Sequence, residues 1–327
     1  MNPASALKPR PAPALVSFIF PVYNEAEGLP HLRSSLETWL SNSQQPAEIV
    51  LVDDGSRDGS FGMIQDWAAS DPRVRGLSFS KNFGHQMAVS AGLAIAQGDA
   101  VVIMDADLQD PLEVVPEMIN RYREGYDVVY GQRVARDGET VFKRASAWLF
   151  YRLMRRFVHP DLPADTGDFR LVSRRCLDVI LRMNEQHRFL RGLFAWVGFP
   201  QVAVRYKRNP RQFGETKYPF WKMMKLAWNA ALSFSTFPIK LITAGGFATA
   251  TLACAYGAYA VVQKYFFHNT VQGWTGLVVI LGLIGGMILV SLGVIGEYVG
   301  RIFEEIKRRP LYIVSEDTGP RSPRPTP

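Results

Sequence analysis

Two long segments without charged side chains limit the possible folds of this chain more than any other feature. Residues 241–263 form the first, between Lys240 and Lys264, and residues 271–296 form the second. Each is longer than the roughly 20 apolar residues that a helix needs to cross a bilayer. Two such segments in succession favour transmembrane helices over a pair of helices buried in a soluble core. We predict that the helices span about 241–263 and 273–296.

The connection between the two segments is too short to form a domain, so they should form a helical hairpin with both ends on one side of the membrane. Lys222, Lys225 and Lys240 precede the hairpin. Further basic residues follow it, namely Arg301, Lys307, Arg308 and Arg309. Positively charged flanks stay on the cytosolic side of a membrane. We therefore predict two spans in the cell inner (plasma) membrane, with both termini and the remainder of the chain in the cytosol.

The residues before the hairpin alternate between short apolar segments and helical patterns. The predicted strands are 15–20, 48–52, 74–79, 100–104 and 126–130, and the predicted helices between them are about 26–40, 59–69, 84–97 and 111–123. Strands of this length that alternate with helices indicate an α/β domain with a mostly parallel sheet that is covered on both faces.

The two ends of the chain are rich in proline. Residues 1–14 also lack the apolar segment of a signal peptide, so we predict a disordered leader there. A disordered tail is predicted from about residue 315. The chain contains only two cysteines, Cys176 and Cys254, which excludes a disulfide framework and favours a reducing, cytosolic setting.

Basic residues are concentrated shortly before the hairpin. The segment 205–225 has one acidic residue, Glu215, and many basic ones: Arg205, Lys207, Arg208, Arg211, Lys217, Lys222 and Lys225. Such a stretch suits phosphate groups or an anionic membrane surface, and a solvated loop is the alternative. Residues 219–238 mix aromatic and aliphatic side chains with lysines, which predicts an interfacial amphipathic helix. Residues 145–158 show a similar pattern, and an ordinary surface helix is the alternative for both.

Polar motifs follow three of the predicted strands. They are Pro21-Val22-Tyr23-Asn24-Glu25, Asp53-Asp54-Gly55-Ser56 and Asp105-Ala106-Asp107-Leu108-Gln109. Ligands of parallel sheets bind at the carboxyl ends of the strands, so these motifs should converge on one site. The sequence has neither a P-loop motif nor a strand-linked G-x-G-x-x-G motif, which argues against a nucleotide triphosphatase and a dinucleotide-binding fold.

The third motif can hold a metal ion. Asp105 and Asp107 are two residues apart and face the same way in an extended segment. Together with the amide oxygen of Gln109 they form a set of hard oxygen ligands that suits Mg²⁺ or Mn²⁺, particularly when substrate phosphates supply the remaining ligands. The alternative is a turn that caps the helix beginning near Pro111. Asp54 has two possible roles. Its carboxylate can accept hydrogen bonds from a nucleobase or ribose, and the alternative is that it belongs to a turn.

Taken together, these motifs resemble glycosyltransferase family 2, whose members have the Rossmann-like GT-A fold. Further matches are Ser80-Lys81-Asn82-Phe83-Gly84, Gly131-Gln132-Arg133, Gly167-Asp168-Phe169-Arg170-Leu171, and Arg211 with Gly214, Thr216 and Lys217. The segment from Ile295 through Pro310 is similar to the polyprenyl-phosphate branch, which includes bactoprenol glucosyltransferases and dolichyl-phosphate mannose synthases. The resemblance covers about residues 17–314 and does not specify the sugar.

The sequence patterns and the resemblance together predict an order of domains. They are a disordered leader (1–14), a GT-A catalytic domain (15–218), an interfacial amphipathic helix (219–238), the two transmembrane helices (239–298), and a cytosolic C-terminal segment with a disordered tail (299–327).

The resemblance also implies a role for individual residues. The donor nucleotide would be bound by Pro21, Tyr23, Glu25, Val52, Asp54, Asp105 and Ala106, and the metal by Asp105, Asp107 and Gln109. Phosphate groups would contact Arg133, Arg144, Ser146, Arg211 and Lys217, and the catalytic residues would be Asp107, Asp168 and Arg133. A phosphate monoester is largely dianionic at neutral pH and needs little help from a base. We therefore expect Asp168 to orient the acceptor or the sugar, and its action as a base is the alternative.

The implied reaction is the inverting transfer of a sugar from a nucleotide-sugar donor to polyprenyl (undecaprenyl) phosphate, with Mg²⁺ or Mn²⁺ as cofactor. UDP-glucose is the favoured donor, and a GDP-mannose-dependent polyprenyl-phosphate or dolichyl-phosphate mannose synthase is the alternative. A non-catalytic membrane scaffold that binds nucleotide sugars is a second alternative. The expected partners are the donor, the lipid acceptor and the bilayer. A nucleic-acid partner would leave the two apolar segments unexplained, and a homo-oligomer is left open.

Overall fold

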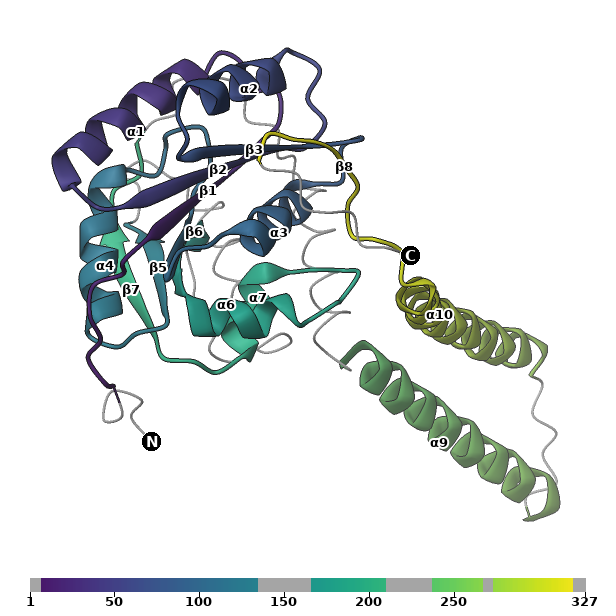
Figure 1. The fold of residues 1–327 in the computed structure, drawn as a ribbon. Coiled ribbons are helices and arrows are strands. Elements are labelled where there is room, and N and C mark those ends of the chain that lie inside the picture. Colours follow the sequence, from purple (N-terminus) through teal and green to yellow (C-terminus); the bar gives the residue numbers. More distant parts are fainter. Residues whose placement is uncertain (1–6, 135–165, 210–236, 267–272, 320–327) are drawn as a thin grey trace. The chain divides into compact units, whose positions relative to one another are not determined.

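The computed structural model describes residues 7–134, 166–209, 237–266 and 273–319. The chain divides into two compact units. The first unit extends to Lys222 and also includes the chain from Pro310 onward, and it holds the sheet and the helices packed on it (Figure 1). The second unit, from Met223 to Arg309, holds the two long C-terminal helices.

The described residues of the first unit form an eight-stranded mixed sheet. Its strands are β1 (Val16–Val22), β2 (Ala47–Asp53), β3 (Val74–Phe79), β4 (Ala100–Ile103), β5 (Val128–Arg133), β6 (Thr166–Ser173), β7 (Gln201–Tyr206) and β8 (Val314–Asp317). They lie in the order β7-β5-β6-β4-β1-β2-β3-β8. Strands β3, β2, β1 and β4 are parallel neighbours, β5 and β7 are also parallel, and β6 and β8 run antiparallel to the strands beside them. The predicted fold class, an α/β domain with a mostly parallel sheet, is confirmed.

Helices cover both faces of this sheet (Figure 1). They are α1 (Leu29–Ser43), α2 (Ser60–Ser70), α3 (His85–Ile95), the 3-10 helix η2 (Leu112–Val114), α4 (Val115–Arg123), α6 (Arg174–Leu181) and α7 (Leu190–Trp196). Side chains of α1, α2 and α4 share one apolar core with the sheet, whereas α3 packs on β1 and β2 and also contacts α6.

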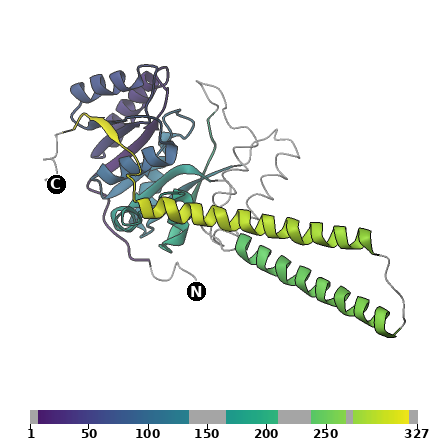
Figure 2. The same ribbon diagram turned by 90° about the vertical axis from the view of Figure 1, so that its right-hand side faces the viewer.

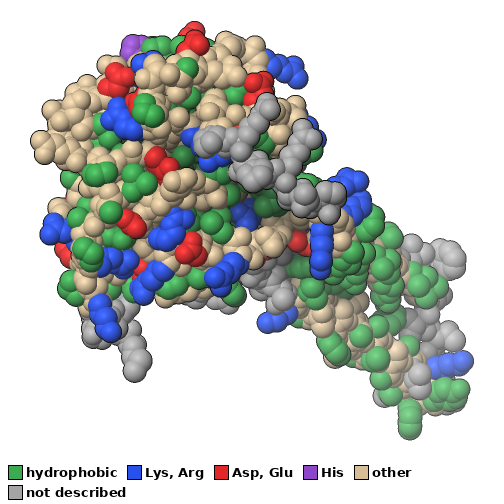
Figure 3. Space-filling view, viewed as in Figure 1, with side chains coloured by type: hydrophobic (Ala, Val, Ile, Leu, Met, Phe, Trp, Pro, Cys, Tyr) green, Lys and Arg blue, Asp and Glu red, His purple; other side chains and the backbone are tan. Residues whose placement is uncertain are grey.

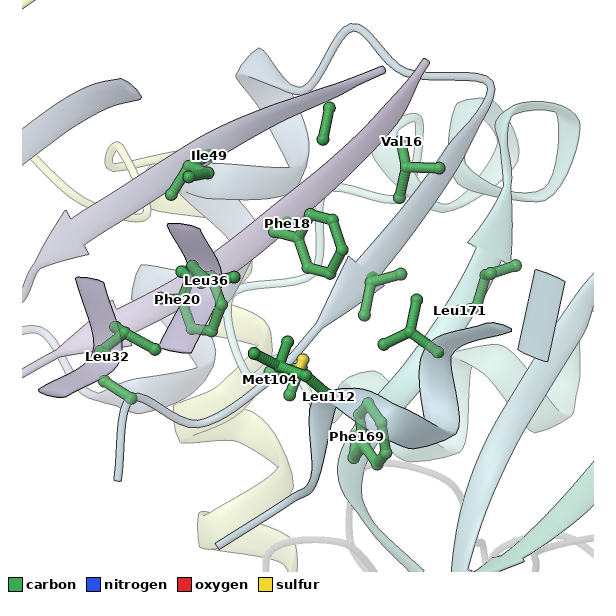
Figure 4. Packing of buried hydrophobic residues seen from close by; sticks show 14 of the residues in the cluster. Val16, Phe18, Phe20, Leu32, Leu36, Ile49, Met104, Leu112, Phe169 and Leu171 are labelled. Carbon is green, nitrogen blue, oxygen red and sulfur yellow. The ribbon is translucent and has the colours of Figure 1, made fainter. Parts of the chain in front are cut away.

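The strand alternation directs neighbouring residues into opposite layers. Phe18 and Phe20 of β1 point into the core that includes Leu32 and Leu36 of α1 (Figure 4). Between them, Ile19 lies against Gly92 of α3, where an added Cβ atom would come within 2.4 Å of the isoleucine side chain. Glycine at this position therefore allows α3 to approach the sheet closely.

Residues 7–14, which we predicted to be part of a disordered leader, are held against the domain. Arg10 donates a hydrogen bond of 2.6 Å to the backbone carbonyl of Gly125 and pairs with Asp127 at 3.1 Å. The Arg10 guanidinium also lies 4.6 Å from the centre of the Tyr122 ring. The composition of this segment suggested disorder, but the contacts of Arg10, together with a hydrogen bond of 2.8 Å from the Ala14 amide to Asp99, hold it on the domain.

Asp127 is the centre of an ionic cluster that should contribute measurably to the stability of the domain. Its side chain is fully buried and accepts hydrogen bonds from Ser173 Oγ at 2.6 Å and from Arg175 Nε at 2.7 Å, in addition to the contact with Arg10. Burial raises the pKa of Asp127, but the hydrogen bonds from Arg175 and Ser173 outweigh burial and hold that pKa below its ordinary value.

We expect Asp127→Asn to lower the free energy of unfolding by about 2 kcal/mol at pH 7, because the buried carboxylate loses its charge while Arg175, whose side chain is 60% exposed, can turn to solvent. Since the folded-state pKa is depressed, the contribution of Asp127 is present above the unfolded pKa of about 4 and is lost as pH falls toward the folded value. Urea unfolding of both proteins between pH 3 and pH 7 measures the effect. Glu37→Gln, which breaks the exposed pair with Arg33, is the matched control and should change stability by less than about 0.5 kcal/mol.

The chain returns to the sheet after the second long helix, in a segment that we call the C-terminal strap (residues 310–319). Its strand β8 pairs antiparallel with β3. We predicted a disordered tail from about residue 315, so the prediction is wrong for 315–319. The strand sequence Val-Ser-Glu-Asp is exposed at every position and lacks the apolar alternation by which strands are recognised.

The second unit is a hairpin of two helices, α9 (Phe237–Phe266) and α10 (Trp274–Lys307), which run side by side (Figure 2). The Oγ1 atom of Thr249 lies 2.9 Å from the sulfur of Met287 across the hairpin. Both helices are long and apolar enough to cross a membrane, with mean hydropathies of 1.3 and 2.1 over their candidate spans. Apolar side chains also cover their outer surface (Figure 3), and Leu252 and Leu289 are each 71% exposed.

Helix α10 continues beyond residue 296, where we predicted the second span to end. Its 34 residues correspond to a length of about 51 Å, whereas the apolar core of a bilayer is about 30 Å thick. The additional turns mix charged and apolar side chains. Glu297 pairs with Arg301 across one of them at 3.4 Å, and Ile302 and Ile306 are exposed apolar residues. The predicted interfacial helix 219–238 and the amphipathic segment 145–158 lie outside the described residues, apart from Phe237 and Pro238 at the start of α9.

Candidate active site

The loops that follow β1 and β2 are bonded to each other at the carboxyl edge of the sheet. The side-chain oxygen of Asn24 accepts a hydrogen bond from the Arg57 backbone amide at 2.9 Å, and the Asn24 backbone amide donates to Ser56 Oγ at the same distance. The Glu25 amide donates to Ser60 Oγ at 3.0 Å. Asn24 has a positive φ of 52°, which asparagine tolerates better than most residues. The first two sequence motifs therefore form one structure.

Strand β3 and the loop after it join this structure through two buried carboxylates. Asp53 accepts a hydrogen bond from Ser78 Oγ at 2.9 Å, and Asp54 accepts from the backbone amides of Phe83 and Gly84 at 2.7 and 2.9 Å. Burial raises the pKa of Asp54, and these two amides partly oppose that effect. Asp54 therefore fixes the loop Ser80–Gly84.

Gly55 is required where the second and third loops meet. Its φ is +70°, a region that favours glycine, and an added Cβ atom would come within 2.6 Å of the Lys81 backbone.

The residues predicted to bind the donor nucleotide lie around these loops. Pro21 and Val52 are register partners in β1 and β2. Tyr23 follows β1 with 46% of its surface exposed, and Glu25 is partly exposed in the same loop. An exposed aromatic ring at this position is suited to stacking with a base. The assignment of these residues to the donor nucleotide stays a prediction.

The loop after β4 gathers acidic side chains around one arginine. Arg208 follows β7, and its Nη2 atom lies 4.0 Å from both Asp105 Oδ2 and Asp107 Oδ2. Its Nε atom lies 3.6 Å from Asp110 Oδ1. Burial and the neighbouring carboxylates raise the pKa of Asp105 to about 6, although His85 opposes the shift. The structure thus places Asp105 and Asp107 at one point, as the sequence predicts, and adds Asp110 and Arg208 to them.

These residues could supply some of the ligands of a divalent cation, but they do not form a complete coordination shell by themselves. Within the described part of the chain, no three His, Cys, Asp or Glu side chains are arranged to hold a metal by themselves. Yet Asp110 Oδ2 is buried without a hydrogen-bond partner among the described residues, and Asp105 and Asp107 share a cationic neighbour. Gln109 is buried, and its backbone carbonyl accepts a hydrogen bond from the Asn209 amide at 2.9 Å. Ligands from the substrate would have to complete such a site.

Asp168, near the start of β6, is clamped by two cationic side chains. Arg191 of α7 donates to its two carboxylate oxygens at 2.7 and 3.1 Å, and His85 Nε2 lies 3.1 Å from Oδ2. Burial raises the pKa of Asp168, but Arg191 and His85 outweigh burial and hold it well below the ordinary value. Burial lowers the pKa of His85, but Asp168 and Asp105 raise it to about 9. His85 Nε2 is also 3.8 Å from Asp105, so this cluster adjoins the candidate metal ligands.

Arg133, at the end of β5, lies beside the same loop. Its Nε atom is 3.5 Å from the Tyr206 hydroxyl, which in turn donates a hydrogen bond of 2.5 Å to Asp110. Its guanidinium packs against Gly167, where a Cβ atom would come within 2.5 Å of Nη2. The predicted catalytic residues Asp107, Asp168 and Arg133 are therefore each placed around the carboxyl end of β4.

Part of the predicted phosphate-binding set cannot be placed. Arg144, Ser146, Arg211 and Lys217 lie outside the described residues. Conversely, the sequence assigned no site role to His85, Arg191 or Asp110, and it indicated Arg208 only as part of the basic segment 205–225. Asp110 follows the third motif directly and His85 follows the Ser80–Gly84 motif, so adjacency was the available signal. For Arg191 the sequence offered none.

Comparisons with known proteins identify the family. Residues 17–181 match the model of Glycosyl transferase family 2. The uncharacterized glycosyltransferase YkcC of Bacillus subtilis (strain 168) is 45% identical over 303 residues, which are 93% of this chain and 94% of that protein. The prophage bactoprenol glucosyl transferase homolog of Escherichia coli (strain K12) is 39% identical over 299 residues, or 91% of this chain and 98% of that protein. The chain belongs to glycosyltransferase family 2.

Membership of this family makes the protein a glycosyltransferase, and its mixed sheet is of the GT-A type. Among solved structures, glucosyl-3-phosphoglycerate synthase from Mycobacterium tuberculosis in complex with Mn²⁺, uridine-diphosphate-glucose and phosphoglyceric acid is 19% identical, with a TM-score of 0.45 over 67% of this chain and 78% of that chain.

Proposed function

We propose that this protein transfers a sugar from a nucleotide-sugar donor to a polyprenyl phosphate at the cytosolic face of the membrane. The observation that carries the proposal is the presence, in one chain, of a family 2 site and two helices able to cross a membrane. The relatives named bactoprenol glucosyl transferases align with 91–92% of the chain, which is too much for the similarity to be confined to the catalytic unit. A lipid-linked acceptor explains why the catalytic unit is tied to such helices.

In this proposal Asp105 and Asp107, with Gln109, would hold Mg²⁺ or Mn²⁺ beside the donor diphosphate. A divalent ion bound there would offset the negative charge that develops on the leaving nucleoside diphosphate. Tyr23, Glu25 and Asp54, with the paired strand residues Pro21 and Val52, would line the nucleoside side of the site, next to Ala106. Arg133 would add positive charge on the phosphate side, together with Arg144, Ser146, Arg211 and Lys217.

The acceptor phosphate acts as the nucleophile in this scheme. One of its oxygens attacks the anomeric carbon while the bond to the nucleoside diphosphate breaks, so an α-linked donor gives a β-linked product. A carboxylate whose pKa is held well below its ordinary value is a weak base, and Asp168 is such a carboxylate. A phosphate that is already largely dianionic does not require one. These two facts support Asp168 as a residue that orients the reactants.

A transfer assay tests the proposal and identifies the donor. Purified protein in liposomes receives undecaprenyl phosphate, Mg²⁺ or Mn²⁺, and one of several labelled UDP- and GDP-sugars. We expect label to enter the lipid fraction with a single donor, UDP-glucose in our proposal, and Asp107→Ala to lower the rate by at least about a hundredfold because a metal ligand is lost. Asp66→Ala, at an exposed position on α2, is the control and should retain the rate.

The assay also separates the alternatives. Transfer from GDP-mannose alone would make the protein a mannose transferase to the same acceptor. Nucleotide-sugar binding without transfer from any donor would contradict the proposed reaction and favour a different acceptor or a binding scaffold.

A further inference from the structure

Arg208 occupies an unusual position for an arginine in a site proposed to bind a diphosphate, because it faces three carboxylates at once. Its guanidinium is within 4.0 Å of Asp105 and Asp107 and within 3.6 Å of Asp110, and only 18% of its side chain is exposed. Asp110 is fully buried. Two of these three carboxylates are the proposed metal ligands. The arginine therefore lies beside the oxygens that a metal ion would need.

The contacts of Arg208 are ionic but loose. An arginine that is paired with a carboxylate normally forms two parallel hydrogen bonds of about 2.7–2.9 Å. Arg191 approaches that geometry with Asp168, at 2.7 and 3.1 Å. The three contacts of Arg208 range from 3.6 to 4.0 Å, and its buried Nε atom and Asp110 Oδ2 make no hydrogen bond with any described residue. Arg208 therefore offsets the negative charge of the three carboxylates without short hydrogen bonds that would fix its position.

The backbone next to Arg208 is fixed even though the side chain is not. Strand β7 pairs with β5 up to Tyr206, and the Asn209 amide donates to the Gln109 carbonyl at 2.9 Å. A change of side-chain rotamer is therefore enough to move the guanidinium away from the carboxylates.

We propose that Arg208 is an internal counter-cation that neutralises the acidic loop before the metal ion binds, and that the metal displaces it toward the donor diphosphate. This inference rests on the proposed function, because it assumes a divalent metal at Asp105 and Asp107. Two cations cannot share the same carboxylate oxygens at close range without strong repulsion. The diphosphate that arrives with the metal offers the displaced guanidinium an anionic partner with matching geometry.

The displacement has two consequences of opposite sign. Without nucleotide, Arg208→Gln should bind Mn²⁺ about tenfold more tightly than the natural protein, because the competing cation is gone. With saturating Mn²⁺, the same variant should bind UDP about tenfold more weakly, because a phosphate contact is lost. Both affinities are measured on the full-length protein in detergent, Mn²⁺ by electron paramagnetic resonance and UDP by calorimetry. Arg182→Gln, exposed at the end of α6, should leave both unchanged.

Each outcome decides the proposal. Unchanged or weaker Mn²⁺ binding by folded Arg208→Gln would overturn it. Arg208→Met, which retains most of the apolar stem, should reproduce both shifts if the glutamine variant does not fold. Unfolding of both variants would contradict the proposal, because Arg208 would then be required for the stability of the fold. A natural protein that binds no Mn²⁺, with or without UDP, would overturn both the counter-cation and the proposed metal site, while the transfer assay would still report on the reaction.

Discussion

Replacing Asp168 by asparagine should lower kcat/KM for sugar transfer by about a thousandfold and the free energy of unfolding by about 3 kcal/mol. Asp168 has 13% of its side chain exposed and is the shared partner of Arg191 and His85. An amide of the same shape retains one hydrogen bond at most with each partner and removes the negative charge between them. Both cations would then lose the interaction that orients them, next to Asp105.

The stability loss and the activity loss can be separated by a second variant. Asp168→Asn combined with Arg191→Gln removes a charge of each sign, so it should recover part of the lost stability, and the coupling energy should lie in the range of about 0.5–3 kcal/mol that is typical of residues in contact. Transfer should not recover, because the oriented carboxylate is still absent. Chemical unfolding and the transfer assay are run on the same preparations, with Asp66→Asn as the control for loss of an exposed charge.

The kinetic pattern distinguishes orientation from base catalysis. If Asp168 orients the acceptor or the sugar, Asp168→Asn should raise the KM of that substrate as well as lower kcat. A loss confined to kcat, with both substrates bound as tightly as before, would contradict the orienting role and would return Asp168 to consideration as a base.

The first half of the sheet was predictable from the sequence because each of its strands is apolar and ends at a polar turn. The predicted strands 15–20, 48–52, 74–79 and 100–104 coincide with β1 to β4 within two residues at each end. Strands β6, β7 and β8 were not predicted. Strand β6 reverses the chain direction inside the sheet, and β8 is an exposed edge strand, and neither property leaves a local signal in the sequence. Strand β7 lies at the other edge of the described sheet and is only partly buried.

The candidate site shows the same division between local and tertiary information. Asp105 and Asp107 could be recognised because they follow a buried strand two residues apart. The cations that surround them come from β3–α3, α7 and the end of β7, and no spacing in the sequence relates His85, Arg191 and Arg208 to one another. Asp54 was recognised as a site residue, but its hydrogen bonds to the Phe83 and Gly84 amides show that it also holds a loop together.

The C-terminal strap leads to the second large expected effect, because it supports the loops that form the proposed donor site. The Tyr312 ring stacks on Phe79 with centroids 4.9 Å apart, and Phe79 meets Phe83 edge-on at 5.7 Å. Phe83 is one of the two residues whose amides Asp54 binds. The strap also bonds to both sides of the loop entrance, since Ser80 donates to the Ile313 carbonyl at 3.0 Å and Ser315 donates to the Ser78 carbonyl at 3.1 Å. Ser78 in turn holds Asp53.

A chain that ends at Arg309 should therefore bind UDP at least about tenfold more weakly and unfold about 8 °C lower than the full-length protein. The lost ring stacking, the Arg75–Asp317 ion pair and the strand pairing together amount to about 3 kcal/mol, and each kcal/mol shifts Tm by about 2–4 °C in a domain of this size. Calorimetry with UDP and thermal unfolding in detergent measure the two effects. Removal of the strap also exposes the edge of β3, so the truncated protein should aggregate more readily.

A chain that ends at Gly319 is the matched control, because it retains every strap contact named above and should behave like the full-length protein. Asp317→Asn is a graded variant that weakens the ion pair with Arg75 and leaves an oxygen to accept from the Gly319 amide, and it should change UDP affinity by less than about twofold. If the chain ending at Arg309 bound UDP normally while its Tm fell, the strap would stabilise the sheet edge without supporting the donor loops. If UDP affinity fell with little change in Tm, the ring contacts from Tyr312 to Phe83 would be the part that matters for the site.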